Sequence, residues 1–262
     1  MAKLTWDQIG ARYYETGIDR GVLYASGEKA VPWNGLISVM EKPSGGDVKS
    51  YYVDGVKYLQ TSAVNEEFEA TITAYTYPPE FSKCDGTNQI RSGLFLTHQR
   101  RTSFGLSYRT MIDNDASVKG YKLHLVYDAL VKPSQVERKS IGSSVDPVNF
   151  SWDIVTRAPA ITGYKRTAHV VIDTRYASTT TISDVETILY GSPSQAARLP
   201  SLDELLVIFD TNAALKVIDH GNGTFTVIGP DDAVVMTGAT TFEITWPTVT
   251  IIDSNTYSIA QG

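Results

Sequence analysis

The chain has 262 residues, 42% of them hydrophobic and 20% charged, and a net charge of -6 at pH 7, which is the composition of an ordinary folded protein with a sizeable core. This acidic balance argues against a nucleic-acid binder that grips phosphates, and no apolar stretch approaches the roughly 20 residues of a membrane-spanning helix. The N-terminus lacks the apolar region of a signal peptide, so we expect a protein that is made and used in a cytoplasm.

The first element predicted along the chain is a hairpin with its turn at Asp54 and Gly55. These two residues separate the aromatic and β-branched runs 51–53 and 56–58, and glycine tolerates the positive φ that a tight turn needs. The preceding residues 42–47 are rich in glycine and include a proline, which favours a flexible segment. We therefore expect residues 41–59 to project as a loop that a partner orders.

Strands dominate the rest of the first 200 residues. Several segments alternate polar and apolar residues with a period of two and are rich in β-branched and aromatic types, the pattern of half-buried strands. They cover residues 68–75, 104–112, 121–131, 148–155 and 168–174. The sequence therefore predicts a mainly β fold.

Helix is predicted at two places only. In 183–190, Ser183 is the expected N-cap, Glu186 completes a capping box, and Gly191 ends the helix. A second short helix is expected over 201–208.

The last quarter of the chain differs in charge from the rest. Residues 201–262 hold eight acidic residues and one basic residue, Lys216, whereas residues 1–200 hold 22 basic and 21 acidic residues. The change falls beside the turn-prone stretch 191–194 and Pro200, where we place a domain boundary. Residues 201–262 then form a small acidic C-terminal β domain or appendage, with short strands expected at 215–218, 224–228, 234–237, 242–246 and 250–252.

Residues suited to chemistry are present but show no catalytic or metal-binding spacing. The four histidines, His98, His124, His169 and His220, are far apart in sequence, and we expect His124 and His169 to be hydrogen-bonded or solvent-facing strand residues rather than ligands. The single cysteine, Cys84, cannot form an internal disulfide and is expected to be a small apolar filler.

No enzyme signature stands out either. Glu66, Glu67 and Glu69 could serve as paired carboxylates or calcium ligands, but a solvated strand face is the simpler interpretation. The sequence has no nucleophile elbow around a serine and no phosphate-binding loop. We expect no catalytic residue, no metal and no cofactor.

A series of short phrases gives a more specific indication. Read in order, they occupy most of residues 10 to 200: 12–17 (RYYETG), 21–24 (GVLY), 31–36 (VPWNGL), 74–78 (AYTYP), 104–110 (FGLSYRT), 122–127 (KLHLVY), 188–191 (ILYG) and 198–200 (RLP). Together they resemble the major tail protein, or tail tube protein, of long-tailed, non-contractile phages that infect actinobacteria, mycobacteriophages among them.

The resemblance implies a tail-tube-type β-sandwich with a flanking α-helix, spanning residues 1–200. It implies six copies per ring and stacked rings that form a hollow tube in the virion, assembled in the host cytoplasm, through which phage DNA passes without specific binding. Head-to-tail contacts of this kind close into rings, while axial stacking stays open-ended. The implied partners are other copies of the chain and the tail tape measure, tail terminator and tail tip proteins.

Within that framework, candidate residues for each contact follow. The loop 41–59 would join successive rings, and the N-terminal arm 1–24 would pack on a neighbouring subunit. Two acids are candidates for the lumen, where a tube for DNA should not attract phosphate. The candidates are Pro43, Gly45, Gly46, Tyr51, Tyr52, Asp54 and Gly55 in the loop, Trp6, Arg12, Tyr13 and Tyr14 in the arm, and Glu67 and Glu69 facing the lumen.

Three alternatives remain open from the sequence. A carbohydrate- or cell-binding β-sandwich module would use the tyrosines and tryptophans as stacking platforms. An enzyme would need a pair of perturbed carboxylates in a deep pocket. The tube of a contractile tail or injection device is a near neighbour of the favoured interpretation.

Overall fold

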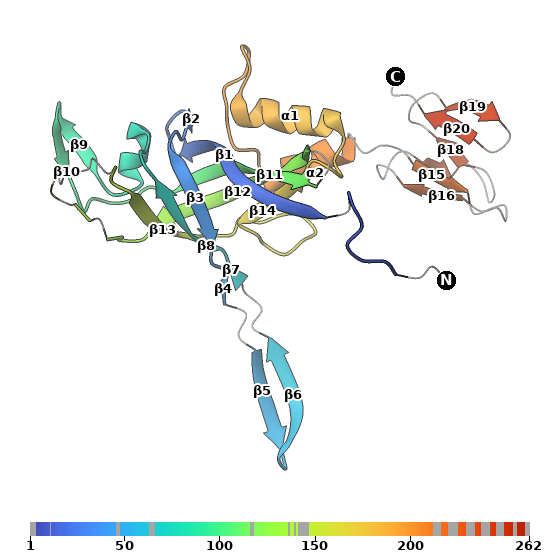
Figure 1. Ribbon diagram of the computed structural model, residues 1–262, viewed down its shortest axis with the longest axis horizontal. Coiled ribbons are helices and arrows are strands. Elements are labelled where there is room, and N and C mark those ends of the chain that lie inside the picture. Colours follow the sequence, from blue (N-terminus) through green and yellow to red (C-terminus); the bar gives the residue numbers. More distant parts are fainter. Residues whose placement is uncertain are drawn as a thin grey trace. The chain divides into compact units, whose positions relative to one another are not determined.

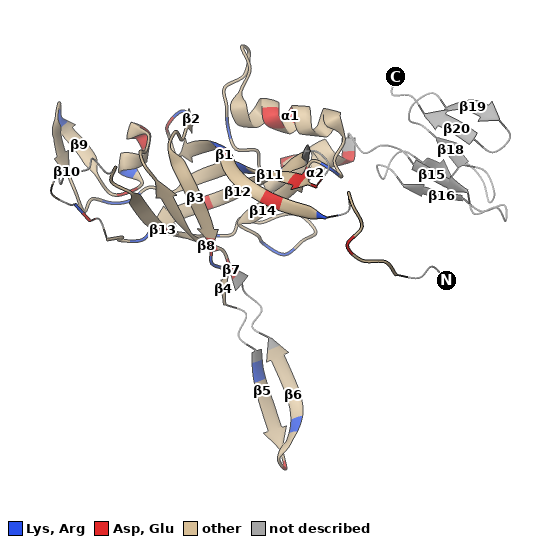
Figure 2. Ribbon diagram, viewed as in Figure 1, with Lys and Arg blue, Asp and Glu red and all other residues tan. Residues whose placement is uncertain are grey.

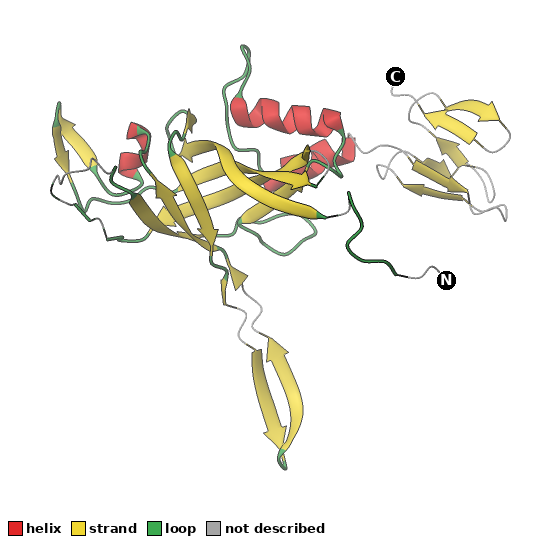
Figure 3. Ribbon diagram, in the orientation of Figure 1, coloured by secondary structure: helices red, strands yellow, loops and turns green. Residues whose placement is uncertain are grey.

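The computed structural model describes residues 4–10, 12–45, 48–62, 66–115, 118–135, 137–138, 140 and 147–211, together with the backbone of short strands beyond residue 211. Strands make up 46% and helices 14% of the chain, so the prediction of a mainly β fold is confirmed (Figures 1 and 3). The chain divides into two compact units, residues 1–177 with 186–202 and residues 178–185 with 203–262. Each unit is described separately.

The first unit is built on one 8-stranded antiparallel sheet. All five strands predicted for this region are present in it, with ends displaced by a few residues. In spatial order its strands are β2 (Val31–Pro32), β1 (Tyr13–Ala25), β11 (Phe104–Asn114), β12 (Val118–Val131), β13 (Phe150–Thr156), β8 (Glu69–Ala74) and β3 (Leu36–Glu41), with β14 (His169–Asp173) also paired to β12.

Strand β12 pairs with different neighbours along its length. Its first half, from Lys122 to Val126, pairs with β14, whereas Ala129–Val131 pairs with β13. Asp128 lies between the two halves with a φ of 46°, and the pairing of β12 with β11 shifts register at the same place. An irregularity of this kind bends the strand, so the sheet divides here and its two halves fold toward each other.

The two halves of the sheet share one hydrophobic core. Ile72 and Trp152 come from β8 and β13, and Leu23 and Leu106 come from β1 and β11. Phe81, from the short 3-10 helix η1 (Pro79–Lys83), fills the centre, with its ring centroid 4.6 Å from that of Trp33 and 5.0 Å from that of Trp152.

Cys84 follows η1 and is buried in this core. Its thiol lies 3.6 Å from the hydroxyl of Thr102, and burial raises the pKa of the thiol, so it stays protonated. The expectation that Cys84 is an apolar filler is confirmed.

Three two-stranded ribbons extend from the sheet. They are β4 (Ser44–Gly45) with β7 (Glu66–Glu67), β5 (Val48–Val53) with β6 (Val56–Ser62), and β9 (Asn88–Arg91) with β10 (Leu94–Leu96). In the β5–β6 hairpin, Asp54 and Gly55 have φ values of 50° and 78°. The predicted tight turn is confirmed, since both central residues adopt the left-handed conformation that a two-residue hairpin loop favours.

The N-terminal arm is shorter than expected. Residues 13–24, assigned to an arm over 1–24, belong instead to β1, which pairs with β11 from Tyr13 to Ala25 and buries Val22 and Leu23. The pairing shifts register between Thr16 and Val22, so the polar-apolar alternation of a regular strand is interrupted in the sequence. This irregularity explains why β1 was not predicted.

Helix α1 (Thr179–Tyr190) begins four residues before the predicted start. The predicted N-cap, Ser183, is wrong, because the hydroxyl of Ser178 accepts a hydrogen bond from the backbone N–H of Thr181 at 3.0 Å. The predicted end is right, since Gly191 has a φ of 80° and its N–H bonds to the carbonyl of Thr187. In the first unit, the Tyr24 hydroxyl donates to the carbonyl of Leu189 at 2.8 Å.

The second unit contains α2 (Leu202–Thr211) from Asp203 onward and a series of hairpins. The helix runs slightly past the predicted 201–208. None of the helices in the described part of the chain is long and apolar enough to span a membrane. The hairpins pair β15 (Lys216–Asp219) with β16 (Phe225–Ile228), β17 (Val234–Met236) with β18 (Phe242–Ile244), and β19 (Val249–Asp253) with β20 (Thr256–Ile259).

The bend in β12 gives a test of the fold. Replacing Asp128 with valine should destabilise the protein by about 1–3 kcal/mol more than replacing it with glycine, because a β-branched residue is strained at positive φ and glycine is not. Both variants lose the 2.6 Å ion pair with Arg157, so their difference isolates the backbone effect. Urea unfolding measures it, and equal stabilities of the two variants would show that the left-handed residue is not needed.

Candidate functional site

The β5–β6 hairpin presents apolar side chains to solvent. Tyr52, Val56 and Tyr58 are 64%, 68% and 78% exposed, and Tyr51, Val53 and Leu59 are also exposed. Because neighbouring residues of a strand point to opposite faces, these side chains occupy both faces of the hairpin. The charged residues between these side chains are Lys49 on β5, Lys57 on β6 and Asp54 at the turn (Figure 2). We call this set of six residues the apolar hairpin.

Hydrogen bonds hold the start of the hairpin segment to the main sheet. The carboxylate of Glu69 accepts hydrogen bonds from Ser44 at 2.9 Å and from Lys132 at 2.5 Å. The hydrogen bond from Lys132 lowers the pKa of Glu69 most, and the one from Ser44 lowers it further. Glu69 is therefore ionised at neutral pH. The backbone N–H of Lys42 also donates to the carbonyl of Glu69 at 2.7 Å. The segment that leads to the hairpin is therefore anchored on β8 and the end of β12.

The other predicted loop and lumen residues differ in their surroundings. Pro43, Gly45 and Glu67 are exposed, and Gly46 lies outside the described residues. Glu69 is half-buried, and its charge is offset by Lys132. Of the two predicted lumen acids, Glu67 alone combines a carboxylate with an exposed position.

The predicted arm residues lie on the surface near the start of β1. Trp6, Tyr13 and Tyr14 are exposed. Arg12 forms an ion pair with Asp115 at 2.9 Å, and the guanidinium of Arg175 lies 5.1 Å from the centroid of the Tyr13 ring. Arg175 therefore covers part of the Tyr13 ring, and both tyrosines remain about half exposed.

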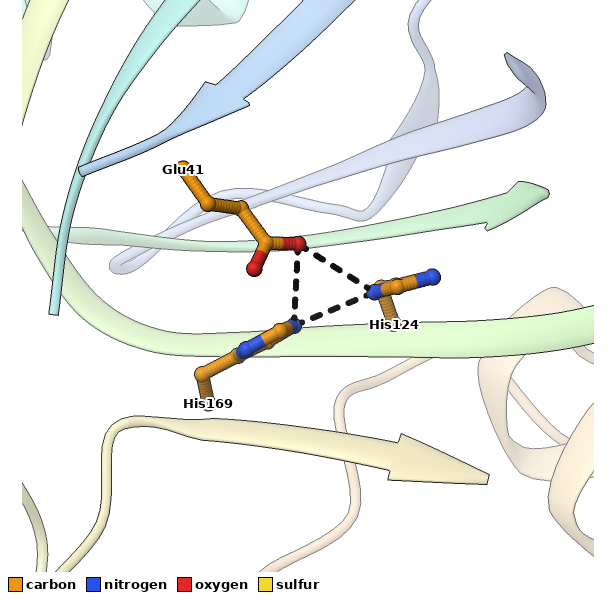
Figure 4. Close-up of side chains that lie close together, drawn as sticks. All are labelled: Glu41, His124 and His169. Atoms are coloured by element: carbon orange, nitrogen blue, oxygen red, sulfur yellow. Dashed lines mark hydrogen bonds and ion pairs between the residues drawn. The ribbon is translucent and has the colours of Figure 1, made fainter. Parts of the chain in front are cut away.

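A second polar site lies between the two halves of the sheet (Figure 4). It brings together Glu41 at the end of β3, His124 in β12 and His169 in β14. The Nδ1 atom of His124 lies 3.2 Å from the Nε2 atom of His169, and the Oε1 atom of Glu41 lies 3.6 Å and 3.9 Å from them. We call these three residues the histidine cluster.

Sheet register explains the cluster. Tyr108 is paired directly with His124, and His169 is paired with Val126, two residues further along β12. The side chains of Tyr108, His124 and His169 therefore lie on the same face of the sheet. The folding-over of β3 then brings Glu41 to this face, where its Oε1 accepts a hydrogen bond from the Tyr108 hydroxyl at 3.0 Å.

A chain of hydrogen bonds fixes which nitrogen of His124 carries its hydrogen. The hydroxyl of Thr110 lies 2.5 Å from Oε1 of Glu15 and donates to that carboxylate. It must then accept from Nε2 of His124, 3.1 Å away. The lone pair of His124 is therefore on Nδ1, which points into the cluster, where Nε2–H of His169 can donate to it.

Burial keeps both histidines neutral. Burial lowers the pKa of His169 to about 4, against the opposing pull of Glu41, and it lowers the pKa of His124 as well. Burial alone would raise the pKa of Glu15, but hydrogen bonds from Lys122 and Thr110 outweigh it and hold that pKa low. At neutral pH the site thus combines two neutral imidazoles with the carboxylates of Glu41 and Glu15, the latter paired with Lys122.

Sequence spacing could not reveal this site. His124 and His169 are 45 residues apart, and Glu41 is distant from both, so no local motif joins them. The expectation that both histidines are hydrogen-bonded is confirmed. The sequence did carry one indication of the site, which is the presence of a histidine within each of the predicted strands 121–131 and 168–174. Of the other histidines, His98 is exposed and bonded to Thr97, and His220 lies outside the described residues.

No family model matches the chain, and the search of curated proteins found no match. A chain of the sheath-tube complex of an extracellular contractile injection system is 14% identical, with 59% of this chain and 89% of that chain covered and a TM-score of 0.30. A chain of the anti-feeding prophage baseplate is 8% identical, with 64% and 97% covered and a TM-score of 0.34. A chain of the anti-feeding prophage tube-terminating cap is 10% identical, with 66% and 97% covered and a TM-score of 0.30. Identities and TM-scores this low assign neither a function nor partners.

The neutral histidines predict a loss of stability on acidification. An unfolded histidine has a pKa near 6.5, and that of His169 in the folded protein is about 4, so the unfolded chain takes up protons first as the pH falls. The stabilisation is complete above pH 6.5 and lost as the pH falls toward 4. Urea unfolding across this range should show a steeper decline for the wild type than for His169→Gln, which keeps hydrogen-bonding groups and does not titrate.

The matched control is His98→Asn, which removes an exposed histidine and keeps a residue that tolerates its φ of 61°. It should follow the wild-type pH profile. If the stability of His169→Gln fell with pH in parallel with that of the wild type, the lowered pKa assigned to His169 would be contradicted.

Proposed function

We propose that the protein is a structural subunit of a phage-type tail tube and that it assembles with copies of itself. The observation that carries the proposal is the apolar hairpin, which exposes aromatic and aliphatic side chains on both faces. An isolated two-stranded hairpin is at best marginally stable in water, and exposed apolar patches mark sites of association. This hairpin gains stability when another subunit covers it.

The sheet offers a complementary feature. Within the described residues, β14 pairs with β12 alone and β3 pairs with β8 alone. Each strand therefore leaves one row of backbone N–H and C=O groups without a strand partner, which is a template for pairing with another chain. A subunit that carries both an extended hairpin and open strand edges can bind a second copy head to tail.

The resemblance to the tail tube proteins of long-tailed phages supplies the geometry of the proposal. Six subunits would close a ring, the apolar hairpin would reach the next ring, and the stacked rings would form the channel for phage DNA in the virion. The tape measure, terminator and tip proteins would complete the tail. Glu67 is the better candidate for a lumen-facing acid, since the charge of Glu69 is offset.

The proposal also covers the two ends of the chain. The exposed aromatic residues Trp6, Tyr13 and Tyr14 would contact a neighbouring subunit. The acidic residues 201–262 would form a separate domain on the outside of the tube, with the boundary near Pro200. An acidic unit in that position would keep tubes apart by mutual repulsion.

The apolar hairpin makes the proposal testable. Replacing Tyr52, Val56 and Tyr58 together with serine should weaken self-association at least 100-fold, on the order of 1 kcal/mol for each buried anchor. The fold should survive, because these side chains do not contribute to the core. Sedimentation velocity over a concentration series measures the association.

The control is Tyr164→Ser, which removes a tyrosine that is 69% exposed and lies outside the hairpin. It should assemble as the wild type does. Equal association of the triple variant and the wild type would refute the role of the hairpin. A wild type that stays monomeric and binds glycans would favour the carbohydrate-binding alternative.

A further inference from the structure

We infer that Glu41, His124 and His169 bind one divalent transition-metal ion of the zinc type, which fastens the start of the hairpin segment to the main sheet. This site is independent of ring formation, because all of its residues lie in the first unit of one subunit. It would give the protein a structural metal that neither the sequence pattern nor the proposed assembly implies.

The distances fit a metal of this size. Zinc bonds to histidine nitrogen and carboxylate oxygen are close to 2.0–2.2 Å, so tetrahedral ligand atoms stand roughly 3.3 Å apart. The two imidazole nitrogens already lie 3.2 Å apart, and Oε1 of Glu41 lies 3.6 Å and 3.9 Å from them. A small movement of Glu41 completes the set. Its side chain is 40% exposed, which gives both the freedom to move and a route of entry for the ion.

The groups around the ligands are those that support a metal. A ligating histidine usually donates its second ring N–H to a carboxylate, carbonyl or water, which fixes its orientation. Nε2 of His124 donates to Thr110, and Oε1 of Glu15 lies 3.7 Å from the same nitrogen. Glu41 is oriented in turn by the hydroxyl of Tyr108. Burial raises the pKa of Tyr108, so the hydroxyl keeps its hydrogen.

The protonation states are also suitable. Metal ligand atoms must be deprotonated, and the hydrogen bond from Nε2 of His124 to Thr110 leaves Nδ1 of His124 without a hydrogen. Nδ1 of His124 already directs its lone pair into the cluster. For the metal to bind, His169 needs only to carry its hydrogen on Nδ1 instead of Nε2, which exchanges the His124–His169 hydrogen bond for two metal bonds. Two imidazoles and one carboxylate select zinc-like ions over magnesium and calcium, which prefer oxygen ligands.

Binding would have a mechanical consequence. Glu41 is the last residue of β3, and the chain continues from it through Lys42 and Pro43 to β4 and the apolar hairpin. His124 lies on β12 and His169 on its neighbour β14, an edge strand in the other half of the sheet. A metal would thus connect the two halves of the folded sheet at the point where the hairpin segment begins.

Isothermal titration of the chelator-treated full chain with zinc chloride near pH 7.5, with thermal unfolding in parallel, tests the inference. The wild type should bind one equivalent and unfold at a higher temperature with zinc, and magnesium should do neither. Glu41→Gln and His169→Ala should each weaken zinc binding at least ~10-fold, the lower end of the losses seen even for residues that only support ligands. His98→Asn should bind zinc as the wild type does.

Glu41→Gln keeps the test decisive if His169→Ala fails to fold, because residue 41 is partly exposed and glutamine can still accept the hydrogen bond from Tyr108. Absence of stoichiometric zinc binding would overturn the inference. Binding that Glu41→Gln leaves unchanged, or that His98→Asn abolishes, would overturn it as well.

Discussion

The divided pairing of strand β12 determines most of the first unit. A strand of ordinary regularity would keep the same two neighbours along its length and continue a flat sheet. Here the left-handed conformation of Asp128 bends β12, so that β14 pairs with its first half and β13 with its second. The sheet then folds over itself, and a single hydrophobic core, in which the rings of Trp33 and Trp152 pack against Phe81, fills the space between the halves.

Two different surfaces follow from that fold. Inside, the closing of β3 over β11 and β12 brings Glu41 to Tyr108 and to a pair of neutral histidines, where every hydrogen bond on His124 is accounted for. Outside, the same β3 strand leads into a hairpin whose apolar residues the subunit leaves exposed. Glu41 thus lies where β3 ends and the segment that leads to the exposed hairpin begins. A subunit arranged in this way keeps the start of its hairpin segment anchored to the main sheet while the apolar hairpin stays exposed to solvent.

Local patterns predicted the elements that follow ordinary rules. The alternation in 121–131, the Asp54–Gly55 turn and the stop at Gly191 each correspond to a structural feature. Strand β1 was not predicted, because its register shifts break the alternation of polar and apolar residues. The start of α1 was misplaced, because Ser183 resembles an N-cap although Ser178 performs that role.

The histidine cluster escaped prediction for a different reason. It depends on three strands that are distant in sequence, and a period-two pattern specifies which face a residue occupies but not which strand lies beside it. Knowledge of the pairing of β12 with β14 would have placed His124 next to His169. The hairpin itself was easier to predict, because a tight turn between two apolar runs is a local feature.

The most direct test of self-assembly is electron microscopy of the purified full chain at high concentration without any other component. Long hollow tubes of stacked rings are the predicted result, and their cross-section would also give the number of subunits per ring. Single dispersed subunits at every concentration, with the apolar hairpin left uncovered, would contradict the account.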